Sequence, residues 1–379
     1  MNVLCFNPGS GTLTYRLVQD DQNGDSPGGM IDGIKGETAA ADAAAEVVSK
    51  LADQPIDAIG FRIVHGGPEH FRPARIDESL IGELESIQDL APVHLPTNIA
   101  VIRAVTAKLD RPSIAVFDTG FHQTIPQQAY RYPLPKKIGK KYRRYGFHGL
   151  AHQWVSDSVR CDPSRIGHIG ATDQMISIHF GGGASACAVQ RGKSIATTMG
   201  MTPLEGLMMS TRCGSIDPAI VLSLLRDGYS VDETDHLLNF ESGLLGVSEI
   251  SDDIREIIPA ANQGDSDAQL ALDLYAYRVK ETFGAYFALL GGCDVLAISG
   301  ALVKENPFFR KHVLGDLGCF GLQLDVQRND TDEELTQPTR LSSDASNVTV
   351  AFIPADEERQ IAADVRAFLS AESESGAAK

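Results

Sequence analysis

A run of apolar and small residues interrupted by three glycines, residues 176–190, constrains the fold of this chain more than any other stretch. The pattern on both sides of Gly181-Gly182-Gly183 predicts a strand, a tight turn and a returning strand. Consecutive backbone N–H groups in such a turn can bind an anion, although an ordinary β-hairpin has the same pattern. His179 before the turn and Arg212 after it add an imidazole and a guanidinium. We therefore interpret the stretch as a phosphate-binding hairpin.

The same plan occurs at the start of the chain. Residues 2–6 are a short apolar run, residues 7–12 are a turn of glycine and hydroxyl residues, and residues 13–18 alternate as a returning strand. One hairpin near the start and one near the middle indicate an internal repeat. We predict two related domains that each contribute one hairpin to a shared cleft.

The acidic composition narrows the range of partners. A length of 379 residues suits two domains better than one. The formal net charge of -17 argues against nucleic acid or an anionic membrane surface as a partner. The six cysteines form no Cys-x-x-Cys pair, so neither a zinc site nor a redox motif is predicted. We see no secretory signal and no apolar run long enough to cross a bilayer, and we expect a cytoplasmic protein.

Two charged residues stand at predicted strand ends. Arg62 lies in the apolar run of residues 59–64, shortly before Gly66-Gly67, and Asp118 follows the buried run of residues 113–117. In open α/β sheets, ligands bind at the carboxyl ends of the strands, so both are candidate site residues. Arg62 can equally be an edge-strand residue that reaches solvent, and Asp118 can be a turn or helix cap.

Four lysines and two arginines gather in residues 136–144. We interpret this basic cluster as a solvated face. His148 and His152 follow at a helical spacing that can bind a metal, but no third ligand or glutamate accompanies them, so we do not predict a metal there.

In the order of its motifs, the chain resembles the acetokinase family nearly end to end. Each motif is short, and their order makes the signal specific. The matching stretches are Asn7-Pro8-Gly9-Ser10, Arg62-Ile63-Val64-His65-Gly66-Gly67, Leu90-Ala91-Pro92-Val93-His94, Phe117-Asp118-Thr119-Gly120-Phe121-His122-Gln123-Thr124, Arg144-Tyr145-Gly146-Phe147-His148-Gly149, His179-Phe180-Gly181-Gly182-Gly183, Met199-Gly200-Met201-Thr202-Pro203-Leu204-Glu205-Gly206-Leu207, Thr211-Arg212-Cys213-Gly214 and Ser242-Gly243-Leu244-Leu245-Gly246-Val247-Ser248.

The resemblance implies an α/β fold of two duplicated actin-like ATPase (ribonuclease H-like) domains around a central cleft. We expect residues 1–120 plus 358–379 to form an N-terminal domain on the acetate side, closed by the C-terminal helix. Residues 121–357 are expected to form a C-terminal domain that carries the nucleotide side and the contacts of a homodimer.

The resemblance also implies a reaction, the reversible Mg²⁺-dependent transfer of a phosphoryl group from ATP to acetate, which gives acetyl phosphate and ADP. A carboxylate is ionised at neutral pH, so the nucleophile needs positioning and charge neutralisation rather than a strong base. By resemblance, Arg62 holds the acetate carboxylate, and Asp118 is the essential carboxylate beside it, oriented towards Arg62 or the metal. Arg212 and His148 stabilise the phosphoryl group in the transition state.

Further residues receive roles in the same way. The acetate methyl group is expected against Val64, Val93, Phe147 and Pro203. Mg²⁺ is expected on Asn7 and Glu357, directly or through water. The nucleotide is expected on Thr14, His179, Phe180, Gly181, Gly182, Gly183, Asp253, Ile254, Arg255, Gly300 and Ala301.

Four departures from the family lie mainly on the donor side. Thr14 replaces a lysine, Gly182 replaces an asparagine, Ser215 replaces an aspartate, and residues 300–306 are bulkier than the family's glycine-rich loop. ATP is the default donor and pyrophosphate an alternative.

Two further alternatives concern the acceptor and catalysis itself. Propionate is an alternative acceptor, since one methylene changes binding by only about 1–3 kcal/mol. A non-catalytic actin-like nucleotide-binding protein is a distant alternative, because it would not need Arg62, Asp118 and Arg212 together.

Overall fold

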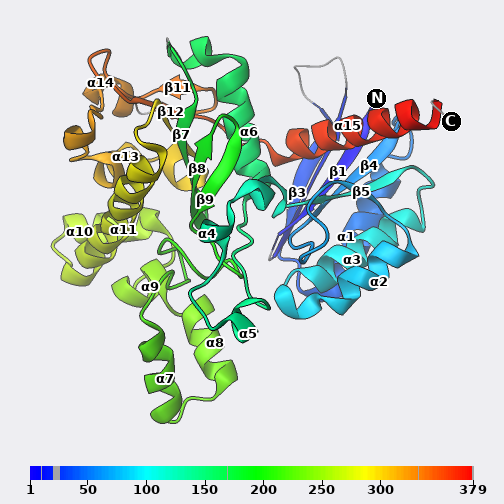
Figure 1. Cartoon of the computed structure of the whole chain (residues 1–379), viewed down its shortest axis with the longest axis horizontal. Coiled ribbons are helices and arrows are strands. Elements are labelled where there is room, and N and C mark those ends of the chain that lie inside the picture. The colour runs from blue at the N-terminus through cyan, green and yellow to red at the C-terminus, as the bar shows by residue number, and fades with distance from the viewer. Residues whose placement is uncertain (10, 20–25, 169, 332, 378–379) are drawn as a thin grey trace. The chain divides into compact units, whose positions relative to one another are not determined.

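A computed structural model of the chain describes residues 1–9, 11–19, 26–168, 170–331 and 333–377 (Figure 1). Ser10, named above in the first glycine turn, lies outside these residues. The chain divides into two compact units. The first contains Met1–Gln123, Gly149–Trp154 and Asp356–Lys379, and the second contains Thr124–His148 and Val155–Ala355. The short segment Gly149–Trp154, expected in the C-terminal domain, therefore groups with the first unit.

The first unit contains a six-stranded sheet in the order β3-β2-β1-β4-β6-β5. Its strands are β1 (Val3–Pro8), β2 (Thr12–Val18), β3 (Gly28–Asp32), β4 (Ala58–Ile63), β5 (Ala74–Arg75) and β6 (Ser113–Phe117). β1, β4 and β6 are parallel, whereas β2, β3 and β5 run antiparallel to their neighbours. The first predicted hairpin is β1 and β2.

The second unit contains a sheet in the order β11-β12-β10-β7-β8-β9. Its strands are β7 (Gln174–Phe180), β8 (Ala184–Gln190), β9 (Lys193–Thr197), β10 (Val295–Ser299), β11 (Thr339–Arg340) and β12 (Thr349–Phe352). β7, β10 and β12 are parallel, and β8, β9 and β11 are antiparallel to their neighbours. Both sheets thus have the same strand order and the same directions, which confirms the predicted duplication.

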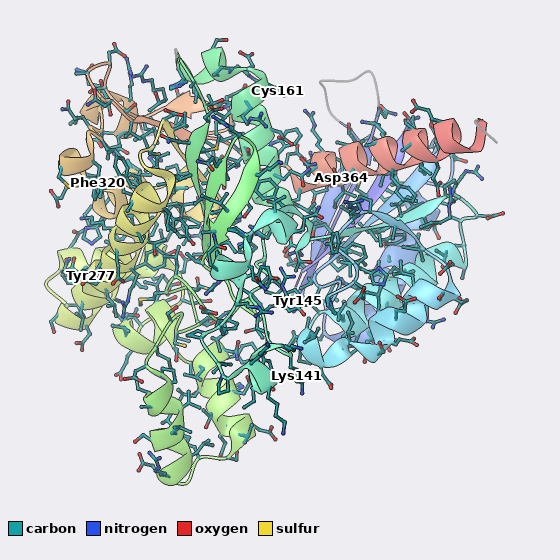
Figure 2. All side chains as sticks on the ribbon, viewed as in Figure 1. Lys141, Tyr145, Cys161, Tyr277, Phe320 and Asp364 are labelled. Carbon is teal, nitrogen blue, oxygen red and sulfur yellow. The ribbon has the colours of Figure 1, made fainter. Side chains whose placement is uncertain are left out.

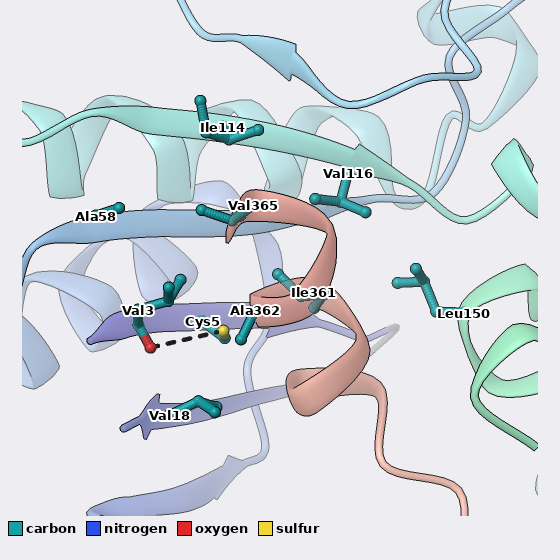
Figure 3. Close-up of a cluster of buried hydrophobic side chains, with 10 residues drawn as sticks. All are labelled: Val3, Cys5, Val18, Ala58, Ile114, Val116, Leu150, Ile361, Ala362 and Val365. Carbon is teal, nitrogen blue, oxygen red and sulfur yellow. Dashed lines mark hydrogen bonds between the residues drawn. The ribbon is translucent and has the colours of Figure 1, made fainter. Parts of the chain in front are cut away.

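Helices cover the sheet of the first unit. They are α1 (Gly36–Lys50), α2 (Glu78–Ser86), α3 (Leu95–Thr106) and α15 (Glu357–Ala377). Figure 3 shows Ile361, Ala362 and Val365 of α15 packed with side chains of β1, β2, β4 and β6. A Cβ atom at Gly60 would lie 2.5 Å from Ile361 Cγ2, so the glycine allows α15 to lie close to β4.

The second unit is richer in helices. They are α4 (Gln127–Tyr130), α5 (Lys136–Gly139), α7 (Pro218–Arg226), α8 (Val231–Phe240), α9 (Gly243–Ser248), α10 (Ile254–Asn262), α11 (Ser266–Leu290), α12 (Ala301–Lys304), α13 (Pro307–Leu314) and α14 (Val326–Asn329), and α6 (Gly149–Cys161) begins in the first unit. The long α11 begins at its cap Asp265 and ends at Gly291, whose φ of 74° suits a left-handed C-terminal residue.

The basic cluster has two parts. The four lysines are exposed, as the solvated-face interpretation predicts; Lys141 is labelled in Figure 2. The interpretation is wrong for Arg144, whose side chain is only 17% exposed and pairs with Glu205. Among the described residues, no helix is both long enough and apolar enough to cross a membrane.

Candidate active site

In the first unit, Arg62 and Asp118 form a buried ion pair at the carboxyl ends of parallel strands. Arg62 lies near the end of β4, and Asp118 directly follows β6, where its N–H donates to Ile63 O at 2.9 Å. Arg62 Nη2 lies 3.0 Å from Asp118 Oδ2, with side-chain exposures of 12% and 0%. The pair therefore lies at the edge of the sheet where ligands bind in open α/β folds.

Asn7 connects this pair to two glutamates at the start of α15. Its Oδ1 accepts a hydrogen bond from Arg62 Nη1 at 3.3 Å. Its Nδ2 donates to Glu357 Oε2 at 2.8 Å and to Glu358 Oε1 at 3.0 Å. We call Asn7, Arg62, Asp118, Glu357 and Glu358 the arginine–carboxylate cluster. Its one cation and three carboxyl groups come from three separate parts of the chain, and Asn7 comes from a fourth.

Burial and charge act in opposite directions on this cluster. Burial would lower the pKa of the Arg62 guanidinium, but the charges of Asp118, Glu357 and Glu358 outweigh it and raise the pKa. Burial, followed by the charge of Glu357, raises the pKa of Glu358, although its hydrogen bond from Asn7 acts the other way. Arg62 is therefore permanently charged, and the cluster as a whole is acidic.

The backbone beside Asp118 has no room for a side chain at Gly149. The Gly149 N–H donates to Asp118 O at 2.9 Å, and a Cβ atom at Gly149 would lie 2.1 Å from the same oxygen. Glycine at this position is thus a steric requirement of the turn that fixes Asp118.

In the second unit, the two predicted histidines lie beside the central hairpin. His179 Nδ1 is 3.0 Å from Ser299 Oγ, and His148 Nδ1 is 2.9 Å from Ser185 Oγ. The rings of His148 and His179 meet edge to face with centroids 5.0 Å apart. His148 has left-handed backbone, with φ of 56° and ψ of 28°, a conformation that is uncommon for non-glycine residues.

Gly183 brings His148 and Arg212 to the same turn. A Cβ atom at Gly183 would lie 3.2 Å from His148 Cε1 and 3.3 Å from Arg212 Nη1. A Cβ atom at Gly181 would lie 3.4 Å from His179 Nε2. None of the three glycines has a positive φ. A Cβ atom at residue 183 would therefore displace the His148 ring and the Arg212 guanidinium by a few tenths of an ångström, whereas the backbone conformation does not itself require glycine. We call His148, His179, Arg212 and Gly181–Gly183 the hairpin site.

Gly182 differs from its neighbours. A Cβ atom there would meet nothing within 4 Å among the described residues. The position where the family usually has asparagine thus offers room for a side chain. The departure removes a hydrogen-bonding group and leaves the turn sterically unchanged.

A pocket of about 360 Å³ opens near this turn. It is lined by Ser210, Asp252, Asp253, Ile254, Arg255, Ala301, Leu302, Glu305 and Asn306. Asp253 caps α10 and pairs with Arg255, whose Nη2 lies 2.6 Å from Asp253 Oδ2. The Ser210 N–H donates to Gly182 O at 3.3 Å, so the pocket wall is joined to the glycine turn. We call this cavity the Asp253 pocket, and its volume is within the usual range for small-molecule sites.

The structure places the remaining predicted residues as follows. Thr14 pairs with Asn7 across the first hairpin and is half-buried. Val64 is 3% exposed, whereas Val93 is 51% exposed. Phe147 is 2% exposed and belongs, with Pro203, to the second unit. Because these apolar residues are divided between the two units, the methyl pocket stays a prediction.

Sequence reasoning missed several partners of the predicted residues. Ser185 and Ser299 face His179 across the sheet, since His179 pairs with Ser185 of β8 and with Ser299 of β10. Ser299 could have been noticed in the sequence as a hydroxyl residue next to Gly300. Its position opposite His179, however, follows only from the pairing of β10 with β7. Glu358 was not predicted as a site residue, because the family resemblance assigns a role to its neighbour Glu357 alone.

These two sheets and their charged edges define a duplicated α/β protein of the actin-like class. The chain matches the acetokinase family over residues 3–363. It is 37% identical to an acetate kinase of Acetivibrio thermocellus over 395 residues, which cover 96% of this chain and 98% of the relative. The chain therefore belongs to the acetokinase family, and the resemblance inferred from its motifs is confirmed.

Solved structures give the same result. The acetate kinase of Porphyromonas gingivalis matches with a TM-score of 0.86 and 33% identity, over 97% of this chain and 99% of the other. A propionate kinase of Francisella tularensis matches with a TM-score of 0.83 and 29% identity, over 96% of this chain and 98% of the other. The predicted fold class, two duplicated actin-like α/β domains, is confirmed.

Proposed function

We propose that this protein is an acetate kinase that transfers a phosphoryl group reversibly from ATP to acetate, giving acetyl phosphate and ADP. The observation that carries the proposal is the hydrogen bonding of the Arg62 guanidinium. Among the described residues, no atom accepts a hydrogen bond from its buried Nε. A buried guanidinium donor without a partner is costly, and a substrate carboxylate supplies the missing acceptor.

The acceptor side works through positioning. Acetate is already ionised at neutral pH, so Arg62 needs only to hold and orient its carboxylate. Asp118 fixes the Arg62 guanidinium through the contact at 3.0 Å. The family assignment and this geometry together favour catalysis over a non-catalytic nucleotide-binding role.

The donor side works through charge stabilisation. Arg212, His148 and His179 gather around the glycine turn, where they would contact the transferred group and the phosphates. Arg212 Nη1 also donates to Pro203 O at 3.1 Å, which holds the guanidinium in place. Ser185 and Ser299 hold His148 and His179 by their Nδ1 atoms. The hairpin site thus has its donors arranged before any ligand arrives.

Magnesium is part of the proposal, and the arginine–carboxylate cluster fits it. The described residues contain no group of three or more His, Cys, Asp or Glu side chains arranged to hold a metal. Mg²⁺ needs no such cage, because it keeps waters and binds one or two carboxylates together with substrate phosphates. Asn7 and Glu357 would hold it, and the ion would neutralise phosphate charge. The acidic character of the cluster supports this assignment.

ATP is the proposed donor because Ala301, Leu302, Glu305 and Asn306 of the 300–306 segment line the Asp253 pocket and leave it open. Ala301 and Leu302 contribute to its wall, and about 360 Å³ remains. Gly300 has a φ of 98°, and a Cβ atom there would lie 2.3 Å from Phe180 O. The bulkier side chains therefore change the wall of the pocket without closing it.

The direct test is the formation of acetyl phosphate from acetate and Mg²⁺, detected as the hydroxamate, with ATP and pyrophosphate compared side by side. Turnover with ATP is expected. Turnover with pyrophosphate alone would overturn the choice of donor, and no product from folded protein with either donor would overturn the function. Propionate in place of acetate tests the acceptor.

Filling the Asp253 pocket should weaken nucleotide binding selectively. We expect Leu302→Trp to raise the KM for ATP about tenfold or more, because an indole occupies space that the nucleoside needs. The KM for acetate should change less than twofold. Steady-state kinetics with each substrate varied in turn measures both values. Leu270→Trp is the matched control, since Leu270 is 54% exposed on α11 and outside the pocket. An unchanged KM for ATP would contradict the pocket assignment.

The proposed oligomer is a homodimer formed through α7 and α8. None of the α7 residues is buried, and exposed apolar side chains line this helical pair: Ile220, Leu222, Leu225, Tyr229, Val231 and Phe240. An apolar surface of this kind marks an interface in soluble proteins, and a symmetric second copy is the commonest occupant.

The dimer can be tested by light scattering coupled to size exclusion. The parent protein is expected at twice the mass of the chain. The double variant Leu222→Glu/Leu225→Glu should run as a monomer, since four glutamates would face one another in the dimer. Leu289→Glu, also at an exposed leucine of the second unit, should remain dimeric. A monomeric parent protein would contradict the proposal.

A further inference from the structure

Tyr132, Arg144 and Glu205 form a compact group in the second unit that none of the proposed roles explains. Arg144 Nη2 donates to Glu205 Oε1, and Tyr132 Oη donates to Glu205 Oε2. The side chains of Arg144 and Glu205 are 17% and 32% exposed. We call these three residues the Glu205 network. Both oxygens of its carboxylate are occupied by donors from a different segment of the chain.

The network also holds the backbone of residues 198–201. Arg144 Nη1 donates to Thr198 O at 2.6 Å and to Met199 O at 2.9 Å. The Met201 N–H donates to Tyr132 Oη at 2.9 Å. One guanidinium and one phenol therefore fix three backbone groups of this loop.

Gly200 shows how closely the network packs on the loop. A Cβ atom at Gly200 would lie 1.8 Å from Glu205 Oε2 and 2.4 Å from Tyr132 Oη. The carbonyl of Gly200 accepts hydrogen bonds from the N–H groups of Tyr145 and Gly146, at 3.0 and 3.2 Å. A side chain at this point would have to displace the Glu205 carboxylate and the Tyr132 hydroxyl, so the network as it stands depends on Gly200.

Both segments lead directly to proposed site residues. Pro203 lies between the loop and Glu205, and its carbonyl accepts the bond from Arg212 Nη1 at 3.1 Å. Arg144 and Tyr145, the latter labelled in Figure 2, precede Phe147 and His148 by only a few residues. A shift of the loop would therefore move the Arg212 guanidinium and the apolar face of Pro203 together.

On the basis of the proposed function, we infer that the Glu205 network sets the position of Pro203 and Arg212, and through them both the turnover rate and the preference for acetate over propionate. Its members are positioning residues, since their contacts go to the protein. The charge of Glu205 balances that of the half-buried Arg144. Burial, with the hydrogen bond to Glu205, raises the pKa of Tyr132, so its hydroxyl stays a donor at neutral pH.

Glu205→Gln is the first variant, because it keeps the shape of the side chain and removes the charge that Arg144 faces. We expect kcat to fall about 10–100-fold, since a displacement of roughly 1 Å at a reacting group can cost 10²-fold. The ratio of kcat/KM for propionate to that for acetate should rise several-fold as Pro203 loosens. The KM for ATP should change less than twofold, because the Asp253 pocket contains no member of the network.

Tyr132→Phe is the second variant and removes one hydroxyl. It leaves the Arg144–Glu205 pair in place, so its effect on kcat and on the acid ratio should have the same direction and be smaller. If Glu205→Gln does not fold, Tyr132→Phe decides the kinetic question. Arg340→Lys is the matched control: Arg340 is 19% exposed and also donates to two carbonyls, Gly167 O and Ser343 O, at 2.8 and 2.9 Å. It should leave both kinetic quantities unchanged.

Hydrogen exchange gives a readout that does not depend on activity. The Met201 amide should be protected in the parent protein and exchange at least tenfold faster in Tyr132→Phe, because its acceptor is gone. If the parent protein made no acetyl phosphate, the proposed function would fail, and the inferred effect on catalysis with it, while exchange would still decide whether the network holds the loop.

Two results would overturn the inference itself. One is a folded Glu205→Gln enzyme with parental kcat and parental acid preference. The other is a fall in kcat with an unchanged acid ratio and unchanged exchange at residues 199–203, which would show that the loop had not moved.

Discussion

Asp118→Asn is expected to lower kcat for acetyl phosphate formation by about 10²–10³-fold, the range found when one preorganised electrostatic contact is removed from an active site. The amide keeps the size of the carboxylate but loses the charge that holds Arg62 at 3.0 Å. The KM for acetate should rise as well, because the Arg62 guanidinium, which we propose binds the acid, is no longer fixed. Steady-state kinetics with acetate and ATP measures both effects.

The same variant should be less stable. Breaking a buried ion pair typically costs 3–5 kcal/mol, and we expect about 3 kcal/mol here, since Glu357 and Glu358 still attract the Arg62 charge. Urea unfolding measures the change. Glu372→Gln serves as the control in the same unit, because Glu372 pairs with Arg75 at the surface, where both side chains are more than 40% exposed. It should leave activity and stability almost unchanged. Activity of Asp118→Asn within threefold of the parent would contradict the assignment of Arg62 and Asp118.

Arg212→Ala should give the largest loss of activity, about 10³-fold or more in kcat, as expected for an arginine that stabilises a phosphoryl-transfer transition state. The KM for acetate should change little, because Arg62 remains. Arg212→Lys should recover only part of the loss, since an ammonium lacks the planar fork of donors. Single-turnover measurements would show that the loss lies in the phosphoryl-transfer step.

The melting temperature of Arg212→Ala should change in the opposite sense to that of Asp118→Asn. Burial lowers the pKa of Arg212, which means that the folded protein disfavours its charge. Among the described residues, its guanidinium donates hydrogen bonds to Pro203 O and Met209 Sδ, and it has no carboxylate partner there. Removing the side chain should therefore leave the melting temperature unchanged or raise it, a trade-off typical of functional sites. Arg340→Ala should show the reverse, with normal kcat and a lower melting temperature. A melting temperature of Arg212→Ala well below that of the parent would indicate a structural role.

The duplicated fold could be predicted from the sequence because its signal is local. A glycine turn between two alternating runs specifies a hairpin by itself, and the second copy of the pattern predicted the second sheet. Arg62 and Asp118 were also visible as charges at the ends of apolar strands. The short strands Ala74–Arg75 and Thr339–Arg340 could not be predicted, because two residues carry no periodicity and their pairing depends on β6 and β12.

The partners of the site residues could not be predicted for a related reason. Ser185 and Ser299 meet His179 only through the register of three strands. Glu205 meets Arg144 and Tyr132 across more than 60 residues of chain. The solvated-face interpretation of Arg144 was wrong because most of the cluster that contains it consists of exposed lysines, whereas its partner Glu205 lies far along the chain.

The matching registers of the two sheets also place different polar residues at equivalent positions. Asn7 occupies the same place in β1 as His179 in β7, the last residue but one before each glycine turn. Thr14 faces Asn7 as Ser185 faces His179. In the first sheet, Phe61 of β4 pairs with Phe6 of β1, and Arg62 and Asn7 are the residues that follow this pair. In the second sheet, Ser299 of β10 pairs with His179 of β7. At these equivalent positions, the first unit has Asn7, Thr14 and Arg62, and the second has His179, Ser185 and Ser299. The same scaffold therefore presents an amide beside a guanidinium in one sheet and an imidazole between two hydroxyl residues in the other, so the two edges offer a ligand different hydrogen-bonding groups.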